Sequence, residues 1–193
     1  MTISSLHITH APLARLARRA RVTIAQGGLI AYPTSSCFGL GCDPSNRRAL
    51  KKLLALKGRP QNKGFIIISN DFSQFRPYLQ PVHNKLLEPA LATWPGPHTW
   101  LLPASNKAMA LLKGKHPNIA VRVEGHSSTR RLLSFVKQPL VSTSANPSGK
   151  HPYKTGRDCH RRFGKNVLIL PGRVGRNKTP SSIHDLTTGQ KIR

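Results

Sequence analysis

Hydroxyl and amide side chains gather in the segment PLVSTSANPSG, residues 139–149. Its apolar start predicts the end of a buried strand, and the Asn146-Pro147 pair predicts where the chain leaves that strand. In extended chain alternate side chains share a face, so we expect Ser142, Ser144 and Asn146 to point one way and Thr143 the other. Three neutral donors on one side suit the oxygens of a phosphate or a carboxylate. An ordinary Ser/Asn-rich turn explains this segment, taken alone, equally well.

A second polar stretch is YPTSSCFGLGCD, residues 32–43. Thr34, Ser35 and Ser36 come after a proline at the predicted end of a strand. Gly39 and Gly41 permit close approach of the backbone to a ligand. The stretch lacks the full glycine pattern of a dinucleotide-binding loop, so we do not interpret it as one.

The stretch KGRPQNK, residues 57–63, places Lys57, Arg59 and Lys63 on a constrained turn. Gly58 can adopt left-handed geometry after a helix, and Pro60 stiffens the chain immediately after it. Such a turn suits the binding of phosphates. A solvated surface face remains open as an alternative, because cations occur throughout the chain.

A single cation lies inside the predicted strand IAVRV, residues 119–123. Alternation places Arg122 on the face opposite Val121 and Val123. The planar guanidinium can bind both oxygens of a carboxylate. An Arg facing water from an edge strand is the alternative interpretation.

Charge is the main feature of the composition. The 193 residues include 31 Lys and Arg against 6 Asp and Glu, which gives a formal net charge of +25. An anionic partner, first of all nucleic acid, would relieve the resulting repulsion, although a basic source proteome would give the same excess. So few acids disfavour a paired-carboxylate mechanism and an all-protein carboxylate metal cage. Chemistry on anionic substrates by positive charges fits this inventory better.

The three cysteines, Cys37, Cys42 and Cys159, show no CxxC spacing, which predicts reduced thiols rather than a disulfide framework. No apolar stretch approaches the roughly 20 residues of a membrane span. We therefore expect a cytoplasmic protein without membrane contact.

Strand and helix patterns alternate along the whole chain, which predicts one α/β or α+β domain over residues 1–193, with a core from about residue 7 onward. We expect these elements to position the polar stretches at strand ends and turns. The helices are predicted near residues 13–26, 46–57, 72–79, 83–92, 128–137 and 155–163. The strands are predicted at residues 29–32, 65–69, 99–102, 118–123, 140–144, 167–170 and 182–186.

Taken together, these stretches resemble the YrdC/Sua5/TsaC family. YPTSSCFGLGCD, KGRP followed by KGFIII, WPGPHTWLLP, AVRV, STSANPSG and PSSIHD succeed one another in the order expected for that family. The resemblance covers essentially the whole chain, and the length matches the single-domain TsaC form. It implies a twisted mixed β-sheet flanked by helices, with a basic concave surface.

The resemblance also implies an activity, threonylcarbamoyl-AMP synthesis from L-threonine, bicarbonate or carbon dioxide, and ATP, for threonylcarbamoyladenosine in tRNA. Diphosphate is released, and Mg²⁺ accompanies ATP. By motif, ATP would meet Lys57, Arg59, Lys63, Ser142, Ser144 and Asn146. Threonine would meet Thr34, Arg122 and Ser182, and no residue acts as a covalent nucleophile. The implied partners are tRNA or a downstream tRNA-modifying complex.

Three positions depart from the family pattern, one of them mildly: PSSI varies the usual Pro-Ser-Thr pattern, but Ser182 retains the hydroxyl. Ser35 stands where an acidic residue usually comes after the Pro-Thr pair, and His98 stands where a small apolar residue is more common. Loss of that acid, together with the excess charge, keeps a second function open. This alternative is a non-catalytic YrdC-like protein that binds tRNA or rRNA.

Overall fold

The computed structural model describes residues 11–193; the predicted start of the core at residue 7 lies outside this range. Its helices are α1 (Ala11–Ala25), α2 (Arg47–Lys57), α3 (Asn84–Thr93), α4 (Ala110–Lys113), α5 (Ser127–Val136) and α6 (Gly156–Phe163), with 3-10 helices η1 (Gln61–Lys63) and η2 (Phe72–Tyr78). Its strands are β1 (Leu29–Pro33), β2 (Phe38–Gly41), β3 (Ile66–Ser69), β4 (His98–Pro103), β5 (Asn118–Val123), β6 (Leu140–Ser144), β7 (Val167–Ile169) and β8 (Ser182–Asp185).

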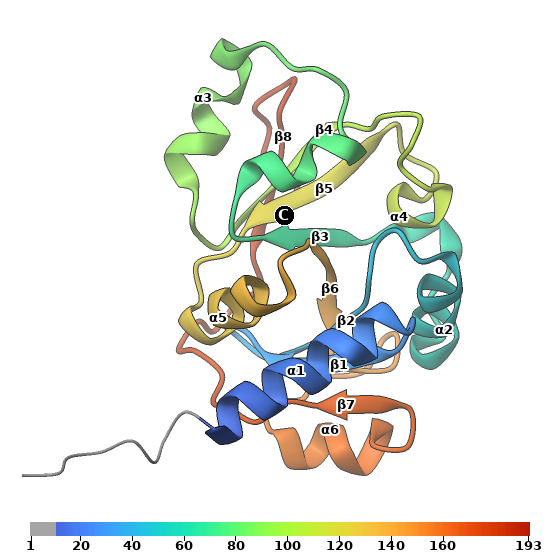
Figure 1. Cartoon of the computed structure of the whole chain (residues 1–193). Coiled ribbons are helices and arrows are strands. Elements are labelled where there is room, and N and C mark those ends of the chain that lie inside the picture. Colours follow the sequence, from blue (N-terminus) through green and yellow to red (C-terminus); the bar gives the residue numbers. More distant parts are fainter. Residues whose placement is uncertain (1–10) are drawn as a thin grey trace, which may run out of the picture.

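The strands form one mixed sheet in the order β7-β1-β2-β6-β3-β5-β4-β8. The pairs β1–β7, β3–β5 and β4–β8 are parallel, and the other neighbours are antiparallel. Figure 1 shows helices on both sides of this sheet. The predicted α/β class, a mixed sheet flanked by helices, is confirmed.

Strand β2 was not predicted, and it changes the role of two glycines. Gly39 and Gly41 pair with Tyr32 and Ile30 of β1. A Cβ atom at Gly41 would lie 2.8 Å from the Tyr32 ring and 2.7 Å from the carbonyl oxygen of Val141. The expectation that Gly41 admits a ligand is therefore wrong, because its missing side chain makes room for Tyr32.

Helices α1 and α5 lie side by side over one face of the sheet (Figure 1). Their apolar residues pack with Ile30, Tyr32, Ile68 and Leu140 in a buried cluster of their own. The helices cover only part of this face. The next row of side chains across the sheet contains Ala120, Ile66 and Ser142, and of these Ile66 packs against the edge of that cluster.

The opposite face of the sheet carries the larger core. Alternation in β5 directs Ile119, Val121 and Val123 into this core and leaves Ala120 and Arg122 on the face of α1 and α5, as predicted. Helix α2 packs its apolar residues here, and it begins with an Asn46 side chain that accepts from the backbone N–H of Ala49.

Two short segments are joined beside the sheet. The backbone N–H of Phe65 donates to the carbonyl of Leu112 at 2.7 Å, and that of Lys115 donates to the carbonyl of Asn62 at 3.2 Å. The missed helix α4 thus lies against the turn that comes after α2. Within residues 11–193 the longest apolar helical stretch falls short of the length that spanning a membrane requires.

The junction of these segments predicts a steep cost for a side chain at Gly114. Its φ is +65°, and a Cβ atom would lie 2.3 Å from the carbonyl oxygen of Asn62. We expect Gly114→Ala to lower the free energy of unfolding by about 3 kcal/mol, because left-handed strain adds to a backbone clash. Urea denaturation measures this loss.

Gly58→Ala is the matched control. Gly58 has a φ of +57°, but a Cβ atom there would meet nothing within 4 Å. Only the left-handed strain remains, so we expect a loss of about 1 kcal/mol. Equal losses in the two variants would contradict the clash at Gly114.

Candidate functional site

A cleft of about 730 Å³ lies on the part of the sheet face that α1 and α5 leave open. Ile66, Ala120 and Ser142 from three neighbouring strands form its floor. The Thr34–Cys37 turn, the Gly64–Ile66 segment and the residues before β8 form its walls.

The cleft opens where β6 loses one of its neighbours. Ser142 pairs with Ile66, the first residue of β3, whereas Thr143 and Ser144 pair only with β2. The edge of β6 beyond Ser142 is therefore open, and Ser142, Thr143 and Ser144 all line the cleft. Thr143, whose side chain the alternation predicts to turn away from the site, thus also borders the cleft, because the sheet separates at this point.

Positive charge dominates the lining. Seven Lys and Arg residues contribute to it: Arg59, Lys63, Lys113, Arg122, Lys154, Lys178 and Arg193. His116 and His151 also line the cleft. Only Arg122 among them forms an ion pair within residues 11–193. The expected basic concave surface is present, and anionic groups are the ligands that it favours.

Arg59 is held in place on the wall. Its guanidinium donates from Nε and Nη2 to the carbonyl of Gly64, at 3.1 and 2.9 Å, and lies 5.3 Å from the centre of the Phe65 ring. The pKa of Arg59 is lowered by burial and by the nearby Arg193. A cation fixed in this way is preorganised to bind a phosphate.

Lys57 lies behind the wall, and its side chain is buried. Its ammonium donates to the carbonyl of Ser144, to the carbonyl of Asn146 at 2.7 Å and to Oδ1 of Asn146 at 3.3 Å. Burial and then Arg59 lower its pKa to about 8. In this arrangement Lys57 fixes the loop after β6.

Asn146 belongs to the same loop network and does not line the cleft. Its Oδ1 accepts from the Ser144 hydroxyl at 2.6 Å, and its Nδ2 donates to the carbonyls of Pro147 and Lys150. Lys57 and Asn146 thus support Ser142 and Ser144, which face the cleft.

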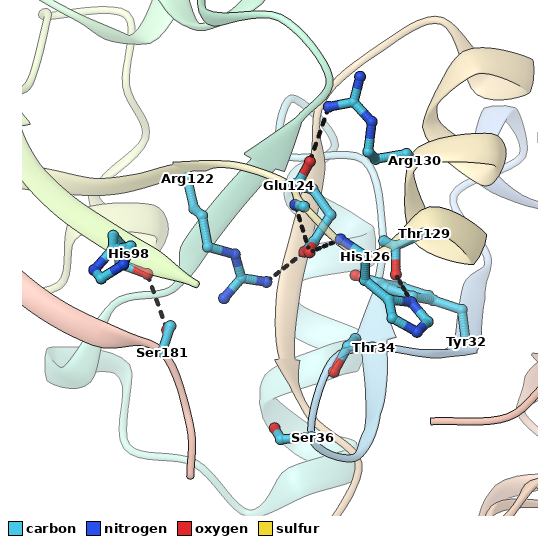
Figure 2. A network of polar contacts seen from close by, with 12 residues as sticks. Tyr32, Thr34, Ser36, His98, Arg122, Glu124, His126, Thr129, Arg130 and Ser181 are labelled. Carbon is cyan, nitrogen blue, oxygen red and sulfur yellow. Dashed lines mark hydrogen bonds and ion pairs between the residues drawn. The ribbon is translucent and has the colours of Figure 1, made fainter. Parts of the chain in front are cut away.

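Arg122, which lines the cleft, forms a buried ion pair with Glu124 (Figure 2). Strand β5 lies between β3 and β4, so the alternative of an edge-strand Arg facing water is wrong. Arg122 Nη2 donates to Glu124 Oε2 at 2.6 Å, while the buried Nε of Arg122 has no partner within the described residues. An unpartnered buried N–H beside the cleft favours binding of an acceptor such as a carboxylate.

Glu124 also connects β5 to α5. Its Oε1 accepts from the backbone N–H groups of Gly125 and His126, at 3.0 and 2.9 Å, and its carbonyl accepts from Arg130 Nη1 at 3.0 Å. A negative charge at this end of a helix is favourable. Sequence reasoning missed Glu124, although its spacing two residues after Arg122 places both on one face of the strand.

A second hydrogen-bond chain reaches the opposite wall. The Thr129 hydroxyl donates to the carbonyl of Pro33 at 2.8 Å, so its contact of 3.2 Å with His126 requires His126 Nδ1–H as the donor. Burial lowers the pKa of His126, which favours the neutral ring. Next to Pro33, the Thr34 hydroxyl donates to the carbonyl of Cys37 at 2.7 Å and can therefore accept from a ligand.

The hydroxyl that the sequence predicted at Ser182 is provided to the cleft by the preceding residue, Ser181. Ser181 lines the cleft and contacts the Thr99 hydroxyl at 3.0 Å. Ser182 points to the other face, where its hydroxyl lies 2.9 Å from His98 Nδ1 and 2.9 Å from His184 Nε2. Ser181 directly precedes β8, and neighbouring side chains of extended chain point to opposite sides, so Ser182 turns away from the cleft.

The structure thus brings most of the predicted residues together. Six of them line the cleft: Thr34, Arg59, Lys63, Arg122, Ser142 and Ser144. Lys57, Asn146 and Ser182 lie outside the lining. The sequence reasoning did not identify Ser181 or Arg193, whose Nη2 donates to the carbonyl of Ser181 at 3.1 Å.

A protein-bound metal centre is not evident in the cleft. Among residues 11–193, no three His, Cys, Asp or Glu side chains gather in a way that would hold a metal ion. The oxygens that the lining offers include the hydroxyls of Ser142, Thr143 and Ser144.

The family model Sua5_yciO_yrdC, described as "Telomere recombination", matches residues 22–193. Similar proteins are named threonylcarbamoyl-AMP synthase. One from Methylobacillus flagellatus is 51% identical over 177 residues, which is 92% of this chain and 98% of the relative. One from Chromobacterium violaceum is 45% identical over 182 residues, 94% of each chain.

Solved structures share the fold. P. abyssi Sua5 complexed with L-threonine is 31% identical, with a TM-score of 0.82 over 89% of this chain and 51% of that one. E. coli YciO is 26% identical, with a TM-score of 0.76 over 89% and 84%. The chain thus spans about half of that Sua5 chain and nearly the full length of the two synthases.

The Arg122–Glu124 pair predicts that Glu124 is critical for stability. We expect Glu124→Ala to lower the free energy of unfolding by about 3–5 kcal/mol, because it leaves the Arg122 charge buried and unpaired. Urea denaturation measures the loss. Glu88→Ala, at an exposed position of α3, is the control and should change stability by less than about 0.5 kcal/mol. A similar small change for Glu124→Ala would show that the ion pair contributes little.

Proposed function

The chain belongs to the Sua5/YciO/YrdC family, and on that premise we propose that its cleft makes threonylcarbamoyl-AMP from L-threonine, bicarbonate or carbon dioxide, and ATP. The observation that carries the proposal is the convergence of four separate polar stretches on one basic cleft. The protein is an enzyme of the transferase class, like relatives that match it almost from end to end.

The reaction has two bond-forming steps. The amine of threonine attacks the carbon of carbon dioxide and gives a carbamate. A carbamate oxygen then attacks the α-phosphorus of ATP, and diphosphate leaves. The reacting groups are mostly anionic, so the main work of the cleft is to bring negative charges together and hold them. No covalent intermediate with the protein is needed.

Arg122 is proposed to bind the threonine carboxylate. Glu124 occupies one N–H of its Nη2 and leaves Nε–H without a partner, so the guanidinium keeps donors for a ligand. Thr34 and Ser181 contribute hydroxyls from opposite walls. The solved P. abyssi Sua5 complex with L-threonine supports a threonine site in this fold. We propose Ser181 in place of Ser182, which the motif alone implied.

ATP is proposed to lie along the other side of the cleft. Arg59 and Lys63 would bind phosphates, and Ser142 and Ser144 would meet the nucleotide. Lys57 and Asn146 would act on the nucleotide chiefly through the loop that they fix. Direct contact of these two residues with ATP stays a prediction.

Mg²⁺ is expected to enter with ATP. The hydroxyls of the lining suit an ion that keeps most of its ligands as phosphate oxygens and water. Such an ion would neutralise phosphate charge, while the residues named above bind and orient the substrates.

The product is proposed to serve threonylcarbamoyladenosine formation in tRNA. The net charge of +25 supports contact with tRNA or with a tRNA-modifying complex that takes the adenylate onward. We also propose a cytoplasmic location, in keeping with three free cysteines.

A diphosphate-release assay tests the activity. Purified protein with ATP, Mg²⁺, bicarbonate and L-threonine should release diphosphate, and omission of threonine or bicarbonate should abolish the release. Serine in place of threonine is a control for substrate choice. No release, combined with salt-sensitive binding of tRNA, would support the non-catalytic RNA-binding alternative instead.

Substitution of Arg122 and substitution of Arg59 should change the KM for different substrates. We expect Arg122→Ala to raise the KM for threonine by about 10-fold or more, because a charged hydrogen bond contributes about 1.5–3 kcal/mol. Arg59→Ala and Lys57→Ala should instead raise the KM for ATP. Steady-state kinetics with each substrate varied in turn measure the difference. Equal effects of all three variants on both substrates would contradict these assignments.

A further inference from the structure

Six cations of the cleft lining have no ion-pair partner within residues 11–193. Besides Arg122, whose charge is paired with Glu124, the lining holds Arg59, Lys63, Lys113, Lys154, Lys178 and Arg193. They come from separate segments of the chain and surround one space. Any group that binds inside this space is therefore exposed to a positive field from several sides.

The six side-chain carboxylates of the chain are all placed elsewhere. Glu124 is occupied by Arg122 and by two backbone N–H groups, and Glu88 is exposed on α3. The other four carboxylates accept hydrogen bonds from nearby residues in turns or at helix starts; they are Asp43, Asp71, Asp158 and Asp185. Asp185 also accepts a hydrogen bond from Asn118. None of the six, all within residues 11–193, lines the cleft.

Groups around the cleft already respond to this field. The pKa of Arg193 is lowered by burial and by Arg122, and that of Arg59 by burial and by Arg193. The pKa of Lys57 falls to about 8 through burial and Arg59. An ammonium inside the cleft would experience the same two effects, loss of water and repulsion by neighbouring cations.

This field bears on the first step of the proposed reaction, which needs a free electron pair on the threonine nitrogen. We propose that the cleft binds L-threonine with its α-amine neutral, and that the positive field of the surrounding cations, rather than a general base, drives the loss of the proton to water. The proposal rests on the proposed function. The proton passes to solvent when threonine binds. The nitrogen then forms a bond to the carbon of carbon dioxide, one C=O π bond opens to place negative charge on oxygen, and a second proton passes from the nitrogen to water to give the carbamate.

Ser35 is central to this proposal, because it lines the cleft next to Thr34, which is proposed to bind threonine. A carboxylate here would form an ion pair with the threonine ammonium and keep the proton on it. A neutral hydroxyl can accept a hydrogen bond from a neutral amine, so it does not require the amine to be protonated. Besides the cations, the titratable side chains that line the cleft are His116, His151 and the Cys37 thiol, whose pKa is raised by burial.

The sign of the pH effect is set by the positive field. The cations lower the pKa of the bound amine below that of free threonine, so binding releases a proton at any pH between the two values. Below the pKa of the bound amine, threonine keeps its proton both when free and when bound. Above the pKa of the free amine, threonine has no proton to release on binding. Threonine affinity therefore rises with pH across this window.

Isothermal titration calorimetry tests the proposal directly. L-threonine is titrated into the full chain at about pH 7, where the free amine is protonated, in buffers with different enthalpies of ionisation. The buffer dependence of the heat gives the number of protons released. We expect about one proton per threonine bound. Binding without proton release would overturn the proposal. Failure of threonine to bind at all would instead overturn the proposed function, and the proposal with it.

A ligand control separates threonine from the protein as the source of the proton. 3-Hydroxybutyrate carries the same carboxylate and hydroxyl without the amine. We expect it to bind without releasing a proton. Equal release with both ligands would place the proton on a protein group such as Lys57 and would overturn the proposal.

Two variants test the role of Ser35. Ser35→Asp adds a carboxylate to the lining, and we expect proton release to fall toward zero. Ser35→Asn is the matched neutral control, and we expect it to keep the release of the unmodified protein. Circular dichroism checks that both variants fold. If a folded Ser35→Asp variant still released one proton, a carboxylate here would not control the amine and the proposal would fail.

Discussion

The buried ion pair between Arg122 and Glu124 links the cleft to the helix layer beside it. One oxygen of Glu124 orients the guanidinium, and the other accepts the N–H groups that precede α5. Helix α5 in turn packs with α1 over part of the sheet face and leaves the rest open. The Glu124 carboxylate thus fixes both the Arg122 guanidinium, which is a donor that lines the cleft, and the start of helix α5. Breaking such a pair is costly because it leaves one charge buried alone.

The scarcity of acids explains how this chain keeps its cleft positive. Several of the six side-chain carboxylates accept local hydrogen bonds away from the cleft. Asp43 accepts from the backbone N–H of Ser45 in a turn, and Asp158 accepts from the Thr155 hydroxyl at the start of α6. The cations of the lining therefore repel one another, which lowers the stability of the empty protein. Anionic substrates relieve that repulsion, so substrate binding and stability are coupled. The same field is proposed both to bind the phosphates of ATP and to act on the amine of threonine.

The sequence predicted those features that depend on short-range pattern. Alternation placed Arg122 opposite Val121 and Val123, and the Gly-Pro frame marked the turn that carries Arg59. It failed where pairing between distant strands decides the outcome. Thr143 lines the cleft because β3 ends beside Ser142, and Gly41 makes room for Tyr32 of a neighbouring strand. Strand register likewise decides that Ser181 rather than Ser182 faces the site.

Lys57 shows why a residue in a functional motif need not face the ligand. A compact ammonium with three donors matches three oxygens of the loop after β6, whereas the planar guanidinium of Arg would not. The backbone N–H of Ser148 donates to the carbonyl of Lys57 at 2.7 Å, so Lys57 binds the loop through its backbone as well as through its side chain. The loop is therefore rigid before any substrate arrives. Because donors that are already in place need no reorganisation during the reaction, a lysine behind the wall can matter for catalysis as much as one inside the cleft.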